Sequence, residues 1–302
     1  MIYRVEFIIY SSTSKLISPV IYGCLIDKLF ELVNEQKANE IIKKIIANKV
    51  LISDAQPMIE NKGKWYRCFY KINIPKLEET PENITLRQKR DNQRKRKHET
   101  GQLKLLCINE EGINETLPPK KIYNSIEFTR IGIQVDRIKE TSEEGILFYH
   151  QEFRFNIQQR YAIYIKLEDV FLRDVFEQCF KAIELTGFGP DASKGSGKIK
   201  FIKNNDRILQ EDYVINNIFI KEKANKNYVN ISSTLLDYEI EKECNFVEFF
   251  TLRYDSKSKF GAKPPYFYAQ AGSIVKAKDG IMKFRRYKKV YIFTCVFPLN
   301  LI

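Results

Sequence analysis

Histidine is almost missing from this chain of 302 residues, which contains only His98 and His150. Histidine-rich metal sites and catalytic triads centred on a histidine therefore have almost no residues to draw on. The six cysteines are far apart, and none forms a CxxC pair with another. This spacing excludes a local metal knuckle or CxxC redox pair. We expect most of the cysteines to be buried as small hydrophobic side chains.

Long hydrophobic runs are missing as well. No stretch of about eighteen apolar residues occurs, so we expect no transmembrane helix. The apolar tract Phe7–Tyr10 is too short for a signal-peptide core, and Val290–Ile302 is interrupted by Thr294, Pro298 and Asn300. We therefore expect a cytoplasmic protein with no membrane partner.

Positive charge, in contrast, is abundant. The chain has 50 Lys and Arg against 38 Asp and Glu, for a net charge of +12. This balance favours a polyanionic partner. The richness in Ile, Lys and Asn is also typical of a genome-wide coding bias, so the position of the charge matters more than its sum. The hydrophobic fraction of 44% is enough for a buried core, and the length suggests two domains or one large one.

Hydrophobic periodicity predicts an α+β protein. Alternation over Ile2–Tyr10 predicts a strand, and Ser18-Pro19 opens a predicted helix as its N-cap and first residue. The i, i+3, i+4 pattern from Leu172 to Ile183 predicts the clearest helix, which ends at Gly187. Further strands are predicted over residues 50–59, 65–74, 126–135, 147–157, 161–167, 198–202, 246–254, 266–271 and 290–297, and a second helix around residues 41–46.

This element order predicts a ferredoxin-like domain with insertions, followed by a second domain. The first covers residues 1–203 and includes a hairpin near 126–157, whose tip we place at Glu143-Glu144-Gly145. The second, residues 204–302, is smaller and rich in strands. A basic insertion at 75–101 has seven Lys and Arg between Arg87 and Lys97, and is interpreted as a mobile loop that binds nucleic acid non-specifically or only faces solvent.

A glycine-rich loop between Gly187 and Gly197 has the residue types that bind phosphates. Glycines let backbone amides approach an anion, and lysine and serine side chains bind phosphate oxygens. The loop is not a P-loop, because Ile199 follows Gly197-Lys198 where Ser or Thr is needed, and because the loop follows a helix and precedes a strand. The alternative is a long flexible turn with no ligand.

Two segments resemble the RAMP superfamily of CRISPR-associated proteins. The loop Thr186–Phe201, "TGFGPDASKGSGKIKF", is similar to the superfamily's glycine-rich loop. The segment Ile131–Phe155 resembles the hairpin block of the fourth-subunit family of the Csm (type III-A) effector complex. Weaker matches cover Ile17–Leu32 and Lys263–Ala277, in the family's order, while residues 60–120 match nothing.

The resemblance implies two ferredoxin-like (RRM-like) domains, the second of them residues 204–302. It also implies a non-catalytic subunit without cofactor or metal that caps the 5′ tag of the CRISPR guide RNA (crRNA). Its implied partners are the large palm-domain subunit and the RNA-backbone RAMP subunit. The implied RNA-binding residues of the glycine loop are Gly187, Gly189, Ser193, Lys194, Gly195, Ser196, Gly197 and Lys198. Arg137, Lys139 and Ser142 on the hairpin are the others, against the alternative of a solvated hairpin.

Other candidates are weighed against this interpretation. A metal-independent endoribonuclease of the same superfamily, which processes precursor RNA, would need His98 or His150 as general base. His98 lies in the basic insertion, and His150 is typical of a sheet-face residue. The basic cluster around Tyr287 suits RNA stacking or a hairpin facing water equally well; it comprises Arg285, Arg286, Lys288 and Lys289.

Overall fold

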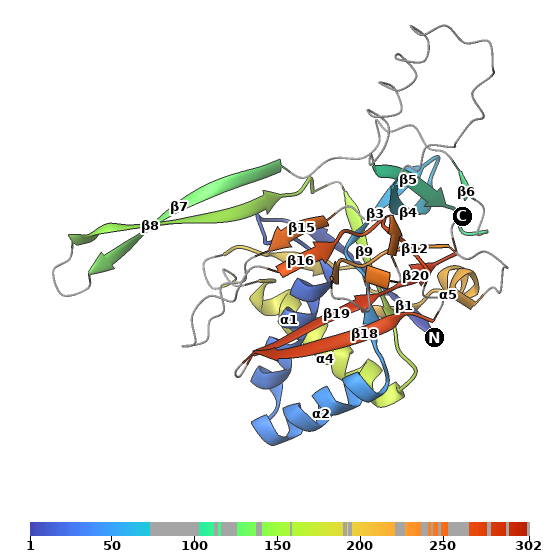
Figure 1. The fold of residues 1–302 in the computed structure, drawn as a ribbon, viewed down its shortest axis with the longest axis horizontal. Coiled ribbons are helices and arrows are strands. Elements are labelled where there is room, and N and C mark those ends of the chain that lie inside the picture. Colours follow the sequence, from blue (N-terminus) through green and yellow to red (C-terminus); the bar gives the residue numbers. More distant parts are fainter. Residues whose placement is uncertain are drawn as a thin grey trace, which may run out of the picture.

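The fold is α+β, with helices packed on a large antiparallel sheet (Figure 1). The computed structural model describes residues 1–72, 103–111, 114–115, 126–136, 141–157, 159–189, 192, 195–220, 227–236, 241–242, 244–246, 249–252, 266–276, 279–287 and 290–300. The basic insertion at 75–101 lies outside these residues. The helices are α1 (Ser18–Leu32), α2 (Glu35–Ala47), α4 (Val170–Thr186) and α5 (Tyr213–Ile220).

The large sheet holds the N-terminal strand β1 between β9 on one side and β10 and β11 on the other. Its order is β10-β1-β9-β3-β4-β5-β6, with β11 also paired to β1 and β2 to β9. These strands are β1 (Ile2–Ile9), β2 (Leu51–Ile52), β3 (Gln56–Asn61), β4 (Lys64–Ile72), β5 (Leu103–Ile108), β6 (Asn114–Glu115), β9 (Arg160–Lys166), β10 (Ile199–Phe201) and β11 (Leu209–Glu211). All the neighbouring strands run antiparallel.

Strand alternation divides the sheet into two faces. Phe7 and Phe201 pair in register, and the Phe201 ring meets Phe180 of α4 with ring centroids 5.3 Å apart. This face therefore carries the helices. On the opposite face, Arg4 forms an ion pair with Asp212, which precedes α5. Residues after 203 therefore cover part of that opposite face.

The last third of the chain is rich in short strands, as predicted. They are β12 (Tyr228–Asn230), β13 (Thr234–Leu235), β14 (Cys244–Phe246), β15 (Phe249–Leu252), β16 (Tyr266–Ala269), β17 (Ile274–Val275), β18 (Ile281–Tyr287), β19 (Val290–Val296) and β20 (Pro298–Leu299). The β18–β19 hairpin crosses the outer side of α1 (Figure 1), where Tyr22 stacks on Phe293. One hydrophobic core runs from Ile2 to Leu299.

The predicted hairpin exists, but its predicted tip is wrong. Strands β7 (Ile126–Asp136) and β8 (Thr141–Arg154) pair along their length, so the chain reverses between residues 136 and 141. Ile133 pairs with Leu147 whereas Val135 pairs with Ser142, so Glu143-Glu144-Gly145 belongs to a bulge in β8. A glycine after polar residues marks a bulge as readily as a turn. In Figure 1 the hairpin projects away from the rest of the protein.

The predicted strand over residues 50–59 is interrupted. The structure has β2 and β3 instead, separated by Ser53–Ala55. The Ser53 N–H donates to Tyr164 O at 2.9 Å, and its hydroxyl accepts from Tyr164 N–H at 2.8 Å. The chain therefore bends inward at this point and brings the Asp54 side chain into the core.

The start of α1 also differs from the prediction. Ser18 is its first helical residue and not its N-cap, and Ile17 at the N-cap makes no side-chain hydrogen bond. Asp54 supplies the missing acceptor, because its Oδ1 accepts the Ser18 N–H at 2.7 Å. The same carboxylate accepts the Ser233 N–H at 2.6 Å and the Ser233 hydroxyl. Asp54 thus ties α1 to a segment late in the chain.

Asp54 makes the stability of the fold depend on pH. Its complete burial raises the pKa to about 6, while the hydrogen bonds from Ser233 and Ser18 lower it. Between about pH 4 and about pH 6, the Asp54 carboxyl is therefore protonated in the folded state but ionised in the unfolded chain. Stability from this group is present at low pH and is lost as pH rises through about 6.

When the pH is lowered from about 7.5 to about 5, we expect the unfolding free energy of wild type to rise by about 1 kcal/mol relative to that of Asp54→Asn. Asparagine keeps the acceptor for the Ser18 and Ser233 N–H groups but does not titrate. Urea unfolding of both proteins across this range measures the difference. Parallel pH profiles would show that Asp54 does not carry the dependence.

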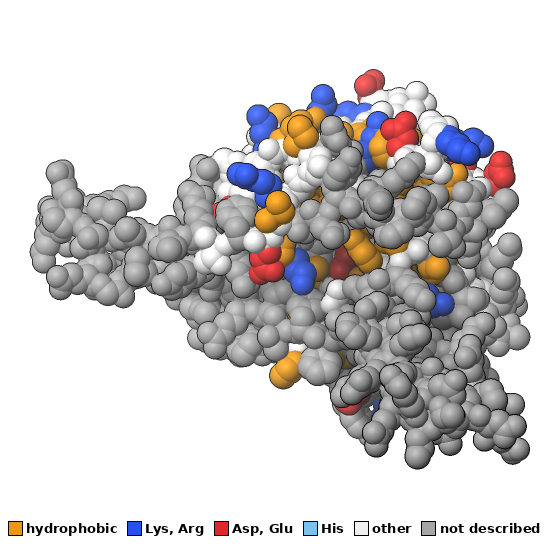
Figure 2. All heavy atoms as spheres, turned by 90° about the horizontal axis from the view of Figure 1, so that it is seen from above, with side chains coloured by type: hydrophobic (Ala, Val, Ile, Leu, Met, Phe, Trp, Pro, Cys, Tyr) orange, Lys and Arg blue, Asp and Glu red, His pale blue; other side chains and the backbone are white. Residues whose placement is uncertain are grey.

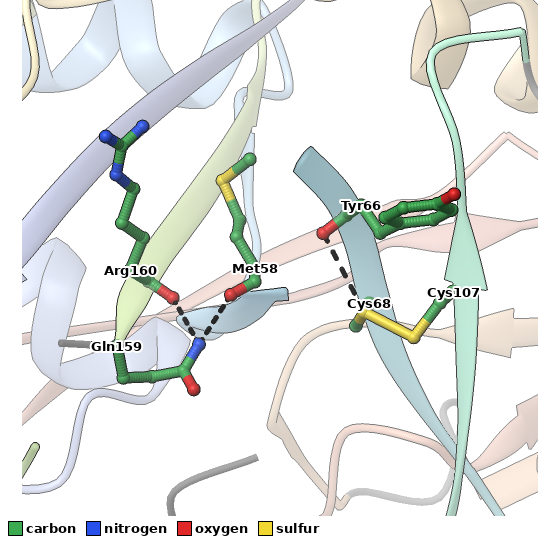
Figure 3. The surroundings of a disulfide bond; sticks show 6 residues. All are labelled: Met58, Tyr66, Cys68, Cys107, Gln159 and Arg160. Atoms are coloured by element: carbon green, nitrogen blue, oxygen red, sulfur yellow. Dashed lines mark hydrogen bonds between the residues drawn. A yellow bond between two sulfur atoms is a disulfide. The ribbon is translucent and has the colours of Figure 1, made fainter. Parts of the chain in front are cut away.

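Two cysteines form a disulfide that we did not predict. Cys68 of β4 and Cys107 of β5 are direct cross-strand partners, with Cα atoms 4.1 Å apart, and are bridged (Figure 3). The expectation of a free buried thiol is therefore wrong for this pair. It holds for Cys179 and Cys295, which are buried and free. Burial raises the pKa of Cys179 to about 12, so its thiol stays protonated.

No helix in the described ranges is long and apolar enough to cross a membrane, as expected.

Candidate nucleic-acid interface

The glycine loop begins where α4 ends. Asp169 caps the start of this helix by accepting the Phe171 N–H at 2.8 Å. At the other end Gly187 has a φ of +93° and donates its N–H to Ile183 O at 2.8 Å. The predicted end of the helix at a glycine is therefore confirmed, because only glycine adopts this backbone conformation without strain.

The loop is closed by its own hydrogen bonds. The Phe188 N–H donates to Gly197 O at 2.8 Å, and the Gly195 N–H to Ala192 O at 3.0 Å. Phe188 itself is buried in the core. The sequence predicted that backbone amides of this loop bind an anion, but these two amides donate to carbonyl oxygens of the loop itself. Phosphate contacts by this loop would therefore fall mainly to its serine and lysine side chains.

A second segment, Ser11–Ser14, lies against the glycine loop. The Gly197 N–H donates to Ser12 O at 2.6 Å, and the Lys198 N–H donates to Ser11 Oγ at 2.8 Å. A methyl group on Gly189 would come within 2.9 Å of Ser14 Oγ. Four consecutive hydroxyl residues at the end of β1 are a visible signal in the sequence, but only the fold shows that they accompany the glycine loop.

Ser11–Ser14 also contacts the root of the β7–β8 hairpin. Thr13 and Phe153 exchange backbone hydrogen bonds of 3.0 and 2.8 Å, and the Ser12 hydroxyl bonds to Glu152 Oε2. The glycine loop, Ser11–Ser14 and the hairpin root are thus adjacent. The structure therefore places the glycine loop next to the root of the hairpin, whereas Ser142, a predicted residue of the hairpin, lies toward its opposite end.

The individual predicted residues divide into three groups. Those placed within the loop are Gly187, Gly189, Gly195, Ser196, Gly197 and Lys198, of which Ser196 is buried and Lys198 exposed. Ser142 lies in β8 opposite Val135. Ser193, Lys194, Arg137 and Lys139 lie outside the described residues.

The other candidates are not part of this cluster as far as the structure describes them. His150 lies in β8 opposite Arg130, and His98 is outside the described residues, as is the run Arg87–Lys97. Arg285 and Arg286 lie in β18, opposite Ile292 and Tyr291. Lys288 and Lys289 are outside the described residues. Within the described ranges, no three His, Cys, Asp or Glu side chains gather as a metal site would require.

Positive charge is not gathered in one place on the described part of the face drawn in Figure 2. Over its coloured part, Lys and Arg side chains lie scattered among hydrophobic, acidic and neutral ones. The net charge therefore does not locate a binding site by itself. Local geometry, such as the position of Lys198 next to the glycine loop, is the better guide.

Comparisons with known proteins locate the fold. No family model and no curated protein sequence matches the chain. A chain in the crystal structure of a Csm3–Csm4 subcomplex of the type III-A CRISPR-Cas interference complex matches with a TM-score of 0.58 and 14% identity, over 99% of both chains. A chain in a Csm1–Csm4 cassette with pppApA matches with a TM-score of 0.51 and 15% identity, over 99% of this chain and 98% of the other.

Csm4 is the subunit common to these two structures. The predicted resemblance to a RAMP-type Csm subunit is thus confirmed at the level of the fold, over nearly the whole chain.

Proposed function

We propose that this chain is the non-catalytic, RNA-binding subunit of a type III-A CRISPR (Csm) effector complex. It caps the 5′ tag of the crRNA and docks the large palm-domain subunit in antiviral defence. One observation carries this proposal: Ser11–Ser14 joins the glycine loop to the hairpin root, in a fold shared with a chain of Csm complexes.

The finer fold assignment belongs to the same proposal. The order β10-β1-β9-β3, with α1 following β1 and α4 following β9, supports a ferredoxin-like first domain of residues 1–203. Residues 204–302 form the second, strand-rich domain. The ferredoxin-like assignment of this second domain rests on the resemblance to the family.

The chemistry of the site suits a sugar-phosphate backbone. Ser11 places a hydroxyl group beside the loop, and Lys198 supplies charge at its end. The Ser12 hydroxyl is bonded to Glu152, and Ser14 Oγ is buried. Hydroxyls and lysines bind phosphate oxygens without reading base sequence. The hairpin root beside them would fix where the RNA backbone passes the subunit. Ser193 and Lys194 extend this set in the sequence.

The partners follow from the same likeness. One matching structure is that of a Csm3–Csm4 subcomplex and the other that of a Csm1–Csm4 cassette. By analogy, this chain contacts the RNA-backbone subunit and the large palm-domain subunit. With both of these subunits in contact with this chain, the crRNA tag would be bound where three proteins meet.

Guide retention in the assembled complex tests the proposal. We expect Ser193→Ala combined with Lys194→Ala to lower the crRNA recovered with an affinity-tagged large subunit about tenfold, because each lost phosphate contact weakens RNA binding. Lys43→Ala, which removes one exposed lysine from α2, is the control. Normal retention in the double variant would remove the loop from the site. Metal-free cutting of repeat RNA that is lost in His150→Ala would instead favour the endoribonuclease.

A further inference from the structure

The sheet has a second surface next to the glycine loop, on the face turned away from α1 and α4. Ile9 and Ile199 pair in register and are buried on the helix side. Tyr10 and Lys198 follow them, and the Tyr10 N–H donates to Lys198 O at 2.8 Å. Because side chains alternate along strands, Tyr10 and Lys198 point to the opposite face.

Exposed cations and an exposed ring lie side by side at this edge. The Tyr10 side chain is 49% exposed, and Lys198 is exposed. Lys200, which pairs with Ile8 in the next row of the same face, is exposed as well. Within the described part of the chain, neither lysine forms an ion pair with an acidic residue. Both are therefore available to an external anion.

A second aromatic and cationic pair lies across the same face. The Arg160 guanidinium of β9 sits 4.0 Å from the centroid of the Trp65 ring of β4. Its Nη1 is 3.8 Å from Glu6 Oε2, and its side chain is 31% exposed. Because Glu6 alternates with the buried Phe7 of the helix side, this pair lies on the Tyr10 side. Figure 3 shows Arg160 where β9 meets β3.

Arg160 lies on β9, the strand next to β1, so the two pairs adjoin each other. Their outermost members, Lys198 and Trp65, are about 19 Å apart, because β10 and β4 are separated by four strand spacings of about 4.8 Å. Asp212 and α5 cover another part of this face, around Arg4 and Arg67. The exposed or half-buried part of this face thus runs from Tyr10, Lys198 and Lys200 past Ile8 to Arg160 and Trp65. Ala162 of β9 and Met58 of β3, on the same face, are buried.

We propose that this strip of the sheet, defined by Tyr10, Lys198, Lys200, Arg160 and Trp65, binds single-stranded RNA. Bases stack on the Tyr10 and Trp65 rings, and the lysines and Arg160 bind phosphates. Aromatic rings interleaved with cations on a sheet suit single-stranded RNA, because bases stack on the rings and phosphates bind the cations. An acidic protein segment would need only the positive charges and not the rings. The inference rests on the proposed function, because Lys198 belongs to both surfaces.

Trp65 is the only tryptophan of the chain, so its fluorescence reports on this strip alone. The full-length chain is titrated with an oligouridine RNA, whose overall binding is followed by the anisotropy of a fluorescein-labelled copy. We expect quenching of Trp65 in parallel with the rise in anisotropy. Lys198→Ala with Lys200→Ala should weaken binding about tenfold and lower the slope of log K against log salt by about 1.4.

The control is Lys37→Ala with Lys43→Ala, which removes the same charge from exposed positions of α2 on the other side of the sheet. It should change neither signal. Tyr10→Leu should weaken binding about tenfold while Tyr10→Phe, which keeps the ring, does not. Tyr10 is exposed, so neither variant is expected to affect folding.

The outcomes separate the two proposals. If anisotropy rises but Trp65 emission stays constant, and both double-lysine variants bind alike, RNA binds elsewhere and only the strip is wrong. If neither oligouridine nor the tag RNA raises the anisotropy, the proposed function itself fails. If polyglutamate quenches Trp65 as strongly as RNA of equal charge, the strip binds acidic protein and the RNA inference is overturned.

Discussion

Gly197→Ala is expected to destabilise the protein by about 4 kcal/mol and to abolish the ordered glycine loop. Gly197 has a φ of +72°, which costs a residue with a side chain roughly 1–3 kcal/mol. A methyl group there would also overlap the carbonyl oxygen of Phe188. Relief of that overlap adds about 1–3 kcal/mol, as for other insertions into packed sites.

The loop cannot easily move to accept the methyl group. Phe188 is buried, and its N–H donates to Gly197 O. Gly197 in turn donates its N–H to Ser12 O at 2.6 Å. A shift of either backbone therefore breaks a hydrogen bond that closes the loop or one that holds it to Ser11–Ser14. Urea unfolding at constant pH measures the loss of stability.

Gly195→Ala is the matched control. Gly195 also has a positive φ, of +85°, but a methyl group at this position would have no neighbour within 4 Å. Its cost should be roughly 1–2 kcal/mol from the backbone conformation alone. Equal destabilisation in the two variants would show that the overlap with Phe188 is relieved at no cost, and the closed loop would not be the rigid element described above.

Local patterns were sufficient for much of the fold. Helix α4 was predicted from its apolar spacing between Leu172 and Ile183, and the structure extends it from Val170 to Thr186. Its end at Gly187 and the alternating strand β1 were also predicted correctly. In these elements every interaction that decides the structure lies within one turn or one strand, so periodicity and capping residues carry the information.

The errors all involve partners that are distant in the sequence. The cap of α1 comes from Asp54 and not from Ser18, and Cys68 meets Cys107 only because β4 pairs with β5. Neither contact leaves a local pattern. In the hairpin, Gly145 was interpreted as a turn residue, but pairing with β7 makes it part of a bulge. Register between strands, which decides this, is a property of both strands together.

The candidate site shows the same division. Residue types identified the glycine loop, since four glycines within eleven positions are rare in a chain with 13 in total. The role of Ser11–Ser14 could not be deduced, because its contact with Gly197 depends on the pairing of β1 with β10. The use of loop amides within the chain was likewise invisible in the sequence, and it moves the expected phosphate contacts from backbone to side chains.

Asp212→Ala should cost about 3–5 kcal/mol, because it leaves the buried Arg67 without its partner and leaves Arg4 with Glu6 alone. The carboxylate is fully buried, and its Oδ2 accepts from Arg4 Nη1 at 2.8 Å and from Arg67 Nε at 2.6 Å. Its Oδ1 accepts the Ile215 N–H at 3.1 Å and so caps α5. One side chain therefore joins β1, β4 and the start of the segment after residue 203.

Three comparisons divide this effect into its parts. Asp212→Asn keeps the cap on α5 but loses the charge, so it should be less harmful than alanine by about 1 kcal/mol, the typical value of a cap. Asp174→Ala removes an exposed partner of Arg173 and should change stability by less than about 1 kcal/mol. Arg67→Met in the Asp212→Ala background should recover part of the loss, since it removes the cation that has lost its partner.

The same variants show whether the two proposed domains unfold together. Because Asp212 follows the proposed boundary and its arginine partners precede it, the ion network crosses the boundary. If Asp212→Ala lowers the midpoint of one cooperative transition, the domains are coupled as one folding unit. If it separates the transition into two, the network is what couples them. A stability within about 0.5 kcal/mol of wild type, with one unchanged transition, would contradict a structural role for this network.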